Sequence, residues 1–483
     1  MEKSTGRVYI IGAGFAGQTL AREINAKAVF GRVVAFLDDD AGKIGRRIEG
    51  IPVLGPIRDV AQLLRMPADE AIIAIPGASR EYLGELYGIL KKAGFQRIRI
   101  LPGISQIIEG DAHLIQTRSI DPQDLLGRTP VAVNLKESLA YLRGKRVLVT
   151  GAGGSIGSEL CRQLLSGGAA RLYLFGHGEN SIYLIDRELR LLQEEGVGEK
   201  SVLVPVIGDL KDRDYIHYIL KKLKADVVFH TAAYKHVPMM EENPVAAVEN
   251  NVFGTKNLID AAKAGGVKRF VHITTDKAVE PVSVYGVSKY LCERLVLENP
   301  DGEDGELRFM AVRFGNVLGS RGSIMLLFQK QIEKGGPLTV THPEMKRWFM
   351  TIPEACSLVL KAGGVGENRS LYLLDMGEPV RIRDMAEQMI RFYGFEPERD
   401  IKIEYIGKRP GERIDEKLWS DAEEPETTGF ERILKLRRKC PPLDLEKLLE
   451  TLKPIVRFDP QKAGAYRNGD LLKKILFEVP KRS

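Results

Sequence analysis

The hydrophobic positions of the N-terminal part of the chain fall into short unbroken runs separated by amphipathic stretches. Runs at 8–11, 32–37 and 71–75 predict strands, and the stretch from Gln18 predicts a helix after the first run. Continuous apolar runs are typical of strands that are buried on both faces of a parallel sheet. The turn between the first strand and the helix carries Gly12, Gly14 and Gly17. This pattern predicts a compact Rossmann-type α/β domain over residues 1–115.

The predicted turn could bind a nucleotide. Glycines between a strand and a helix let phosphate oxygens approach the backbone N–H groups at the helix N-terminus. Asp38, Asp39 and Asp40 end the second predicted strand, where a ribose hydroxyl is bound in folds of this kind. A scaffold that has lost its ligand fits these residues equally well. A regulatory site for a downstream nucleotide-sugar is a further alternative.

A second copy of the pattern follows a predicted linker. Residues 116–143 hold scattered prolines and charges and should form a linker with a short helix near 135–142. The apolar runs that follow predict strands at 147–150, 171–175, 202–208, 227–230, 270–275 and 309–314. Helical stretches alternate with these runs, which predicts a second doubly wound parallel sheet within a domain over residues 144–483. After about Ser320 the pattern is mixed, and we expect a smaller C-terminal substrate-binding lobe there.

Composition excludes several classes of protein. The chain is 44% hydrophobic and 28% charged, as in ordinary globular proteins. Its net charge of +6 on 71 basic and 65 acidic residues is too weak to indicate a nucleic-acid partner, but it suits an anionic substrate. No apolar run reaches the ~18 residues that span a bilayer, and the start has no signal-peptide core. We therefore expect a cytoplasmic protein without a transmembrane segment.

The cysteines and the basic end of the chain add little chemistry. Cys161, Cys292, Cys356 and Cys440 lie far apart and none pair at metal-ligand spacing. Reduced, mostly buried thiols and no metal site are expected. The basic residues near 435–439 and 473–482 should form solvated surface, with contact to a membrane surface as the alternative.

Residues that carry chemistry gather in the second predicted domain. Gly151, Gly154 and Gly157 have the wider glycine spacing of extended short-chain dehydrogenase/reductases. Asp209 and Leu210 follow the third strand of this domain, where a carboxylate can hold the adenine amino group of a dinucleotide. The cofactor expected in this cleft is NAD or NADP. Glu179 could accept a ribose hydroxyl and favours NAD, but His177 could tolerate the extra phosphate of NADP.

Tyr285 and Lys289 are four residues apart and should lie on one face of a helix. An unperturbed tyrosine, with a pKa of about 10, is a poor base at neutral pH. The Lys289 ammonium and a positive nicotinamide should lower that pKa, so that Tyr285 takes a proton from a sugar hydroxyl. Thr275 ends the preceding strand at the edge where ligands bind, and joins this catalytic set.

Asp276 and Lys277 follow Thr275 directly and extend the predicted chemistry. Oxidation of C4 of a hexose to a ketone makes the C5 proton acidic. Asp276 suits the acid that protonates the departing C6 hydroxyl, and Lys277 suits the base that removes the C5 proton. The alternative interpretation is an ordinary ion pair on a surface loop.

Six longer stretches carry a family resemblance. They are residues 151–160, 176–183, 230–238, 313–322, 341–345 and 409–412. They resemble the polysaccharide-biosynthesis family of bacterial nucleotide-sugar 4,6-dehydratases, which act on UDP-N-acetylglucosamine. The resemblance implies a tightly bound, recycled cofactor, a UDP-sugar substrate and a homo-oligomer.

The resemblance also assigns binding residues. The cofactor residues it implies, besides those above, are Ser155, Ile156 and Ala232. The substrate residues it implies are Lys235, His236, Asn316, Ser320, Arg321, Arg347, Arg409 and Glu412. Among them, Arg347 and Arg409 should face the uracil and the diphosphate, because an arginine fork matches phosphate geometry.

Two rival functions and one stereochemical question stay open. A 4-epimerase would share the glycine turn, Thr275, Tyr285 and Lys289, but it would not need Asp276 and Lys277. A nucleotide-sensing protein could keep the fold without turnover. In the resemblance, relatives that retain the C5 configuration carry Met at the position of Tyr285, whereas those that invert it carry Tyr. The chain combines the glycine turn of the first group with the tyrosine of the second.

Overall fold

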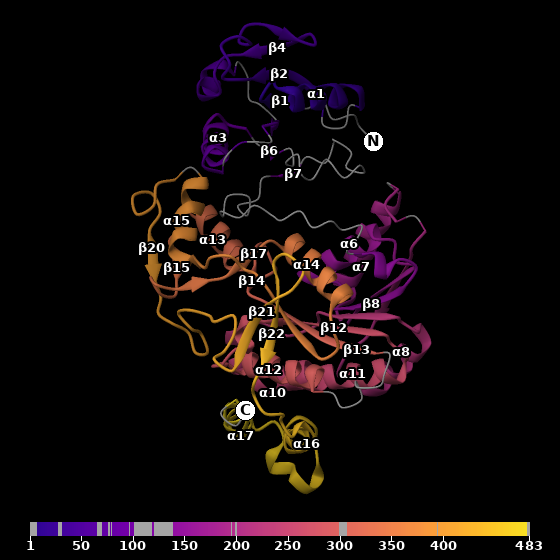
Figure 1. Ribbon diagram of the computed structural model, residues 1–483. Coiled ribbons are helices and arrows are strands. Elements are labelled where there is room, and N and C mark those ends of the chain that lie inside the picture. Colours follow the sequence, from indigo (N-terminus) through magenta and orange to yellow (C-terminus); the bar gives the residue numbers. More distant parts are fainter. Residues whose placement is uncertain are drawn as a thin grey trace. The chain divides into compact units, whose positions relative to one another are not determined.

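The computed structural model describes most of the chain, and its elements are drawn in Figure 1. The described residues are 7–27, 31–64, 70–75, 78, 80–95, 97–100, 118–119, 139–194, 196–198, 200–298, 307–393 and 395–480. Contacts divide the chain into two compact units, one of residues 1–132, 324–340 and 383–405, the other of residues 133–323, 341–382 and 406–483.

Part of the predicted domain division cannot be followed in these residues. The boundary between 115 and 116 and the first half of the linker helix predicted near 135–142 lie outside the described residues. Of that helix, Ala140–Leu142 form a short 3-10 turn, η3. The division into residues 1–115, 116–143 and 144–483 therefore stays a prediction.

The first unit contains the sheet expected around the first glycine turn, parallel from β4 to β6 with the antiparallel strands β3 and β7 at its edges. Its strand order is β3-β4-β2-β1-β5-β6-β7, and β1 pairs in parallel with both β2 and β5. The three predicted strands are found within two residues of their predicted bounds. The strands of this unit are β1 (Arg7–Ile11), β2 (Arg32–Leu37), β3 (Arg47–Ile48), β4 (Ile51–Leu54), β5 (Glu70–Ile73), β6 (Arg97–Ile100), β7 (Arg118–Ser119), β15 (Leu338–Val340) and β20 (Ile403–Tyr405). Its helices are α1 (Phe15–Lys27), α2 (Val60–Leu63), α3 (Arg80–Lys92), α13 (Ile324–Glu333) and α15 (Ile382–Phe392). Helix α15 begins one residue before the segment 383–405 of this unit.

The second unit contains the larger sheet, with the order β10-β9-β8-β11-β12-β13-β18-β22-β21. The strands from β10 to β18 are parallel, and β22 and β21 extend the sheet in antiparallel fashion. All of the strands predicted in this region are found within one residue of their bounds. They are β8 (Arg146–Thr150), β9 (Arg171–Gly176), β10 (Val202–Ile207), β11 (Val227–His230), β12 (Arg269–Thr275) and β13 (Arg308–Phe314). The doubly wound α/β fold is thereby confirmed.

Helices cover both faces of this sheet (Figure 1). On one face lie α6 (Ser155–Ser166), α7 (Glu179–Glu194) and α14 (Ile352–Val365). On the other lie α8 (Arg213–Leu223), α11 (Gly254–Ala264) and α12 (Val284–Leu297). The remaining elements of the unit are α9 (Val237–Glu242), α10 (Pro244–Ala247), α16 (Leu445–Val456), α17 (Gly469–Glu478), β14 (Asn316–Val317), β16 (Lys346–Arg347), β17 (Phe349–Met350), β18 (Ser370–Leu374), β19 (Val380–Arg381), β21 (Glu423–Thr427) and β22 (Ile433–Arg438). The strand order reverses between β8 and β11, and ligands bind outside the carboxyl ends of the strands at such a point.

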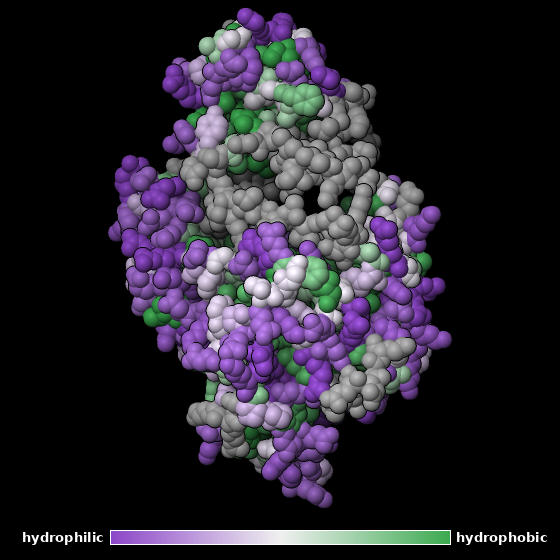
Figure 2. Space-filling view, viewed as in Figure 1, coloured by the Kyte–Doolittle hydropathy of each residue, from purple (hydrophilic) through white to green (hydrophobic). Residues whose placement is uncertain are grey.

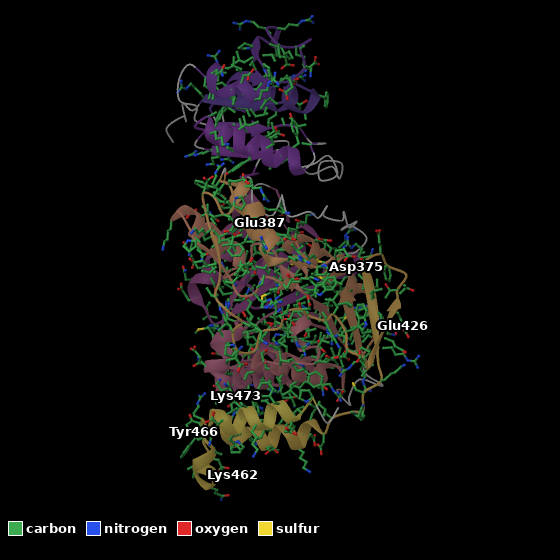
Figure 3. The ribbon with its side chains drawn as sticks, turned by 90° about the vertical axis from the view of Figure 1, so that its left-hand side faces the viewer. Asp375, Glu387, Glu426, Lys462, Tyr466 and Lys473 are labelled. Carbon is green, nitrogen blue, oxygen red and sulfur yellow. The ribbon has the colours of Figure 1, made fainter. Side chains whose placement is uncertain are left out.

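The basic residues near the end of the chain face acidic partners. On the β21–β22 hairpin, Glu424 lies opposite Arg437 and Glu426 lies opposite Lys435, so the acidic residues of β21 face the basic residues of β22. Figure 3 shows Glu426 on this hairpin and Lys473 on the C-terminal helical segment, where Lys473 forms an ion pair with Glu241 at 3.5 Å. The face of the molecule in Figure 2 is mainly hydrophilic, with hydrophobic residues in small separate groups. These pairings favour the solvated-surface interpretation of the basic end.

Candidate active site

The glycine turn after β8 forms a cradle that larger residues would fill. Gly151 has φ +69°, and a Cβ atom there would lie 2.9 Å from the backbone of Ala232. A Cβ atom on Gly157 would lie 2.2 Å from the carbonyl oxygen of Gly151. A Cβ atom on Gly154 would come within 3.1 Å of that same oxygen, which leaves less room than an ordinary contact. The turn therefore brings backbone N–H groups of the first turn of α6 to the surface of the cleft, as phosphate binding requires.

The other predicted cofactor residues surround this turn. Ser155 begins α6, beside Ile156, and its Oγ atom accepts a hydrogen bond from the backbone N–H of Arg321 at 3.0 Å. Glu179 is exposed at the start of α7. Asp209 and Leu210 follow β10, and Asp209 forms an ion pair with Lys211 at 3.2 Å. These positions lie at the carboxyl ends of β8, β9, β10 and β11, which is where a dinucleotide lies in this fold.

Helix α12 carries Tyr285 in its first turn and Lys289 one turn later. The helix begins after Ser283, whose side chain accepts a hydrogen bond from the backbone N–H of Gly286 at 3.0 Å. Such a cap satisfies an otherwise unpaired donor and fixes where the helix starts. Tyr285 and Lys289 are buried, with exposed fractions of 7% and 3%.

The electrostatic environment of Tyr285 differs from the expectation. Burial and the charge of Asp276 raise the pKa of its hydroxyl, and a hydrogen bond with Thr275 lowers it in part. Lys289 was expected to lower this pKa, but its Nζ atom contacts Nε2 of His272 at 3.0 Å and donates to the carbonyl oxygen of Ile273 at 2.6 Å. In this structure, Tyr285 is therefore a weaker acid than an exposed tyrosine.

Asp276 and Lys277 form a buried ion pair at the end of β12. The carboxylate of Asp276 is fully buried, and its Oδ1 atom lies 3.0 Å from Nζ of Lys277 and accepts a bond from Oγ1 of Thr275 at 2.8 Å. Its Oδ2 atom has no hydrogen-bond partner among the described residues. A buried carboxylate oxygen without a partner is costly, and such atoms often mark a functional site. The alternative of a surface ion pair is inconsistent with this burial.

Other predicted substrate residues lie around Lys277. Asn316 Oδ1 accepts a hydrogen bond from Lys277 Nζ at 3.2 Å. Lys235 approaches Oγ of Ser320 at 3.4 Å, and partial burial of the ammonium together with the charge of Lys277 lowers the pKa of Lys235. The ring of His236 packs against Gly322, where a Cβ atom would lie 2.6 Å from the ring, and burial lowers the pKa of His236. The site is therefore rich in positive charge, which suits an anionic substrate.

Arg347 occupies a different place from the one expected. It was expected to face the uracil or the diphosphate, but its guanidinium is buried and donates to the carbonyl oxygens of Lys346, Arg413 and Ile414 at 2.7–2.9 Å. In this structure it fixes the backbone of the loop that follows Arg409. Arg409 itself is exposed, and its backbone N–H donates to Oε2 of Glu412 at 3.1 Å. Arg409 and Glu412 line an open groove of about 680 Å³ together with Val282, Lys408 and Arg413.

Sequence reasoning missed four buried charged residues near the site, Glu293, Arg313, Glu416 and Glu423. Glu416 lies 3.8 Å from Lys277 Nζ and 4.0 Å from the Arg347 guanidinium. Arg313 forms hydrogen bonds with both carboxylate oxygens of Glu293 and of Glu423, and Thr274 donates to Glu293 at 2.8 Å. This network ties β12, α12, β13 and β21 together behind the catalytic residues. The available signal was polar residues inside apolar runs, and in this network it applies only to Thr274 in 270–275 and Arg313 in 309–314.

Comparison with known proteins agrees with the geometry. Residues 147–438 match the family described as polysaccharide biosynthesis protein. The chain is 44% identical over 417 residues to the probable polysaccharide biosynthesis protein EpsC of Bacillus subtilis, covering 86% of this chain and 68% of that protein. It is 30% identical over 291 residues to a UDP-N-acetylglucosamine 4,6-dehydratase (inverting) of Campylobacter jejuni, covering 60% of this chain and 81% of that protein.

Two further matches complete the comparison. The chain is 30% identical over 301 residues to the UDP-glucose 4-epimerase of Rickettsia akari, covering 60% of this chain and 82% of that protein. Among solved structures, Pen from Bacillus thuringiensis matches with a TM-score of 0.55 and 30% identity, covering 65% of this chain and 98% of that chain. Dehydratases and epimerases are thus equally similar at this level.

The fold and the site define an extended short-chain dehydrogenase/reductase of the kind that modifies nucleotide-sugars. The chain belongs to the polysaccharide biosynthesis protein family. The family predicted from the six sequence stretches is thereby confirmed. Among the described residues, no helix is long and apolar enough to cross a membrane. The same part of the chain shows no cluster of His, Cys, Asp and Glu that could hold a metal ion.

Proposed function

We propose that this protein is an NAD(P)-dependent nucleotide-sugar 4,6-dehydratase. Its proposed reaction converts UDP-N-acetylglucosamine to a UDP-4-keto-6-deoxy-hexosamine in surface polysaccharide or glycan biosynthesis. The observation that carries the proposal is the buried Asp276–Lys277 pair between Thr275 and Tyr285, with an Asp276 oxygen that has no partner among the described residues. An epimerase has no use for an acid and a base at this place.

The cleft fits a dinucleotide. The cradle of Gly151, Gly154 and Gly157 would hold its diphosphate, and Asp209 and Glu179 would hold its adenosine end. When bound, the cofactor would accept a hydride from the sugar and return it, so that the net change is the loss of one water. The 30% identity to an enzyme named as a UDP-N-acetylglucosamine 4,6-dehydratase supports the choice of substrate.

The Asp276–Lys277 pair can supply an acid and a base through one internal proton transfer. Elimination needs Lys277 as a neutral amine and Asp276 as a carboxylic acid, and movement of one proton across the 3.0 Å contact produces both. Lys277 would then take the C5 proton while Asp276 protonates the departing C6 hydroxyl. Both side chains are then charged, and the water leaves with the proton of Asp276. Lys277 gives one proton back to C5 when the hydride returns to C6, so the pair ends the turnover one proton short and Tyr285 holds the proton of the C4 hydroxyl.

The same transfer acts on Tyr285. The charge of Asp276 is the largest cause after burial that raises the pKa of Tyr285. Neutralisation of Asp276 removes this repulsion, so Tyr285 ionises more easily to the phenolate that takes the proton of the C4 hydroxyl. One proton transfer from Lys277 to Asp276 thereby gives the acid and the base their reactive forms and favours ionisation of Tyr285.

Incubation of the purified protein with UDP-N-acetylglucosamine tests the proposal. Dehydration gives a product lighter by one water with a C4 ketone and a C6 methyl group, which mass spectrometry and NMR detect. A product of unchanged mass with inverted C4 would instead establish the epimerase, the second candidate, which the relative in Rickettsia akari supports equally at 30% identity. The NMR spectrum of the product also decides between retention and inversion at C5.

A further inference from the structure

The contact between Lys289 and His272 has no part in the chemistry proposed above. Lys289 Nζ lies 3.0 Å from His272 Nε2 and 2.6 Å from the carbonyl oxygen of Ile273. Both side chains are buried, with exposed fractions of 3% and 1%. His272 belongs to β12, which ends in Thr275, and Lys289 belongs to α12, which begins beside Tyr285. The contact therefore joins the two elements that carry the proposed catalytic residues.

The hydrogen-bond pattern of His272 shows what the ring contributes. An ammonium group can only donate, so Nε2 of His272 accepts and Nδ1 carries the ring proton. Nδ1 has no hydrogen-bond partner among the described residues. A buried N–H group without a partner destabilises the fold, and an apolar residue on this strand would avoid that cost. The stability of the sheet alone therefore does not account for a histidine here.

The charged and titratable groups around the contact keep the ring neutral. On β11, His230 lies with its ring centroid 5.0 Å from that of His272. On α12, Cys292 and Glu293 face Lys289, and Arg313 pairs with Glu293 at 2.8 Å. Burial, then the charges of Lys289 and His230, hold the pKa of His272 well below its ordinary value. The ring can therefore accept a hydrogen bond from Lys289 at neutral pH.

We propose that His272 is a positioning residue that holds the Lys289 ammonium at the carboxyl end of β12. Two N–H groups of the ammonium are directed to His272 and Ile273, and the third is left for the bound cofactor and the Tyr285 side of the cleft. The inference rests on the proposed function, which gives Lys289 its part in proton transfer. Burial lowers the pKa of Lys289, and loss of an acceptor lowers it further because the ammonium is then less stabilised.

The test compares His272→Leu with His272→Gln in the full chain with its cofactor. Leu removes the acceptor, so turnover of UDP-N-acetylglucosamine should fall about 10-fold at neutral pH. The alkaline limb of its pH profile should also move to lower pH by about one unit. Gln offers a carbonyl oxygen at similar reach, so His272→Gln should keep most of the turnover and most of the native position of the alkaline limb. His230→Gln is the matched control, since it removes the neighbouring buried ring and should reduce thermal stability without moving the alkaline limb.

A second measurement does not depend on turnover. NMR of isotopically labelled histidine nitrogens in the native chain should show His272 neutral and protonated on Nδ1, and Lys289→Met should change that signal. A His272→Leu profile with its alkaline limb in the native position would overturn the inference, as would a His272 ring protonated on Nε2. If the native protein fails to dehydrate the sugar, the proposed function fails, while the ring measurement still decides the contact between His272 and Lys289.

Discussion

Replacing Asp276 by Asn tests whether Asp276 and Lys277 act as one coupled acid–base pair or as two independent residues. The substitution keeps the size of the side chain but removes the proton that the C6 oxygen would receive. It also removes the acceptor to which Lys277 can transfer its own proton, since Asp276 Oδ1 lies 3.0 Å from Lys277 Nζ. One change should therefore abolish the acid directly and the base indirectly.

The expected magnitudes follow from the geometry. Unit charges at the 3.0 Å of this pair attract by roughly 5 kcal/mol at an effective dielectric constant of about 20. Desolvation opposes much of this attraction. In the variant, Lys277 keeps Asn316 at 3.2 Å and Glu416 at 3.8 Å. We therefore expect a loss of only about 1–3 kcal/mol in the free energy of unfolding, against a loss of about 10²–10⁴ in dehydration.

The assay follows the cleavage of the C6–O bond and of the C5–H bond in the same sample. The sugar is recovered after incubation in heavy water, and its mass reports water loss while NMR reports deuterium at C5. In Asp276→Asn both should fall together, because Lys277 stays an ammonium and cannot take the C5 proton. The control is Asp421→Asn, the same chemical change at a fully exposed side chain, which should leave both rates at the native level.

Two results would refute the coupling. Deuterium incorporation at C5 at the native rate in Asp276→Asn would show that Lys277 acts as a base without Asp276. The double variant Asp276→Asn/Lys277→Met provides the second test, since residues that act as one unit give strongly non-additive losses. A double variant whose loss equals the product of the two single losses would identify two independent residues.

Three further predictions concern other parts of the molecule. Tyr285→Phe should lower turnover by about 10²-fold or more and leave nucleotide-sugar binding nearly intact, and near-native turnover would remove Tyr285 from the mechanism. Burial alone would raise the pKa of Glu423, but the Arg313 charge and hydrogen bonds hold this pKa below 4.5. Ionised Glu423 therefore stabilises the fold above that pH, and this contribution is lost as pH falls through the lower pKa of the folded state. Glu423→Gln should therefore be less stable at neutral pH by about 3–5 kcal/mol and lose less stability on acidification in urea titrations, whereas an equal acid dependence would contradict this. Calorimetry with cofactors and nucleotide-sugars should show a second binding event from the first unit, and a single event per chain would favour the scaffold interpretation.

The strands of the second unit could be predicted from sequence because each is a continuous apolar run between turn residues. The run at 227–230, for example, forms the strand β11. The turn at Gly151 was also predictable, since a Cβ atom at that position would collide with the backbone of Ala232. The division into units could not be predicted in this way. Residues 324–340 and 383–405 group with the N-terminal sheet through contacts such as the stacking of Phe392 on Tyr87, at 4.0 Å between ring centroids. Local periodicity carries no signal for such long-range contacts.

The positions of the predicted site residues were easier to anticipate from sequence than their contacts. Motif spacing brought Thr275, Asp276, Lys277 and Tyr285 together, and the structure places all four at the end of β12 and the start of α12. The partner of Lys289 was not predictable, because His272 is an isolated polar residue inside an apolar run. The backbone contacts of Arg347 were also not predicted, since an arginine that holds backbone carbonyls has the same sequence signal as one that binds phosphate.

Proton balance gives Thr275 a place between the tyrosine and the pair. In the proposed reaction Tyr285 gains the proton of the C4 hydroxyl, and C5 takes one proton back from Lys277 after the water has left. At the end of a turnover Tyr285 therefore holds one proton more than at the start, and the Asp276–Lys277 pair holds one fewer. Oγ1 of Thr275 donates to Asp276 Oδ1 at 2.8 Å, and an interaction with Thr275 lowers the pKa of Tyr285 in part. We infer that Thr275 passes a proton from Tyr285 to Asp276, which would reset both groups without exchange with bulk water. The pair and the tyrosine then form one proton-sharing unit, which is why substitution of Asp276 should affect every step that moves a proton.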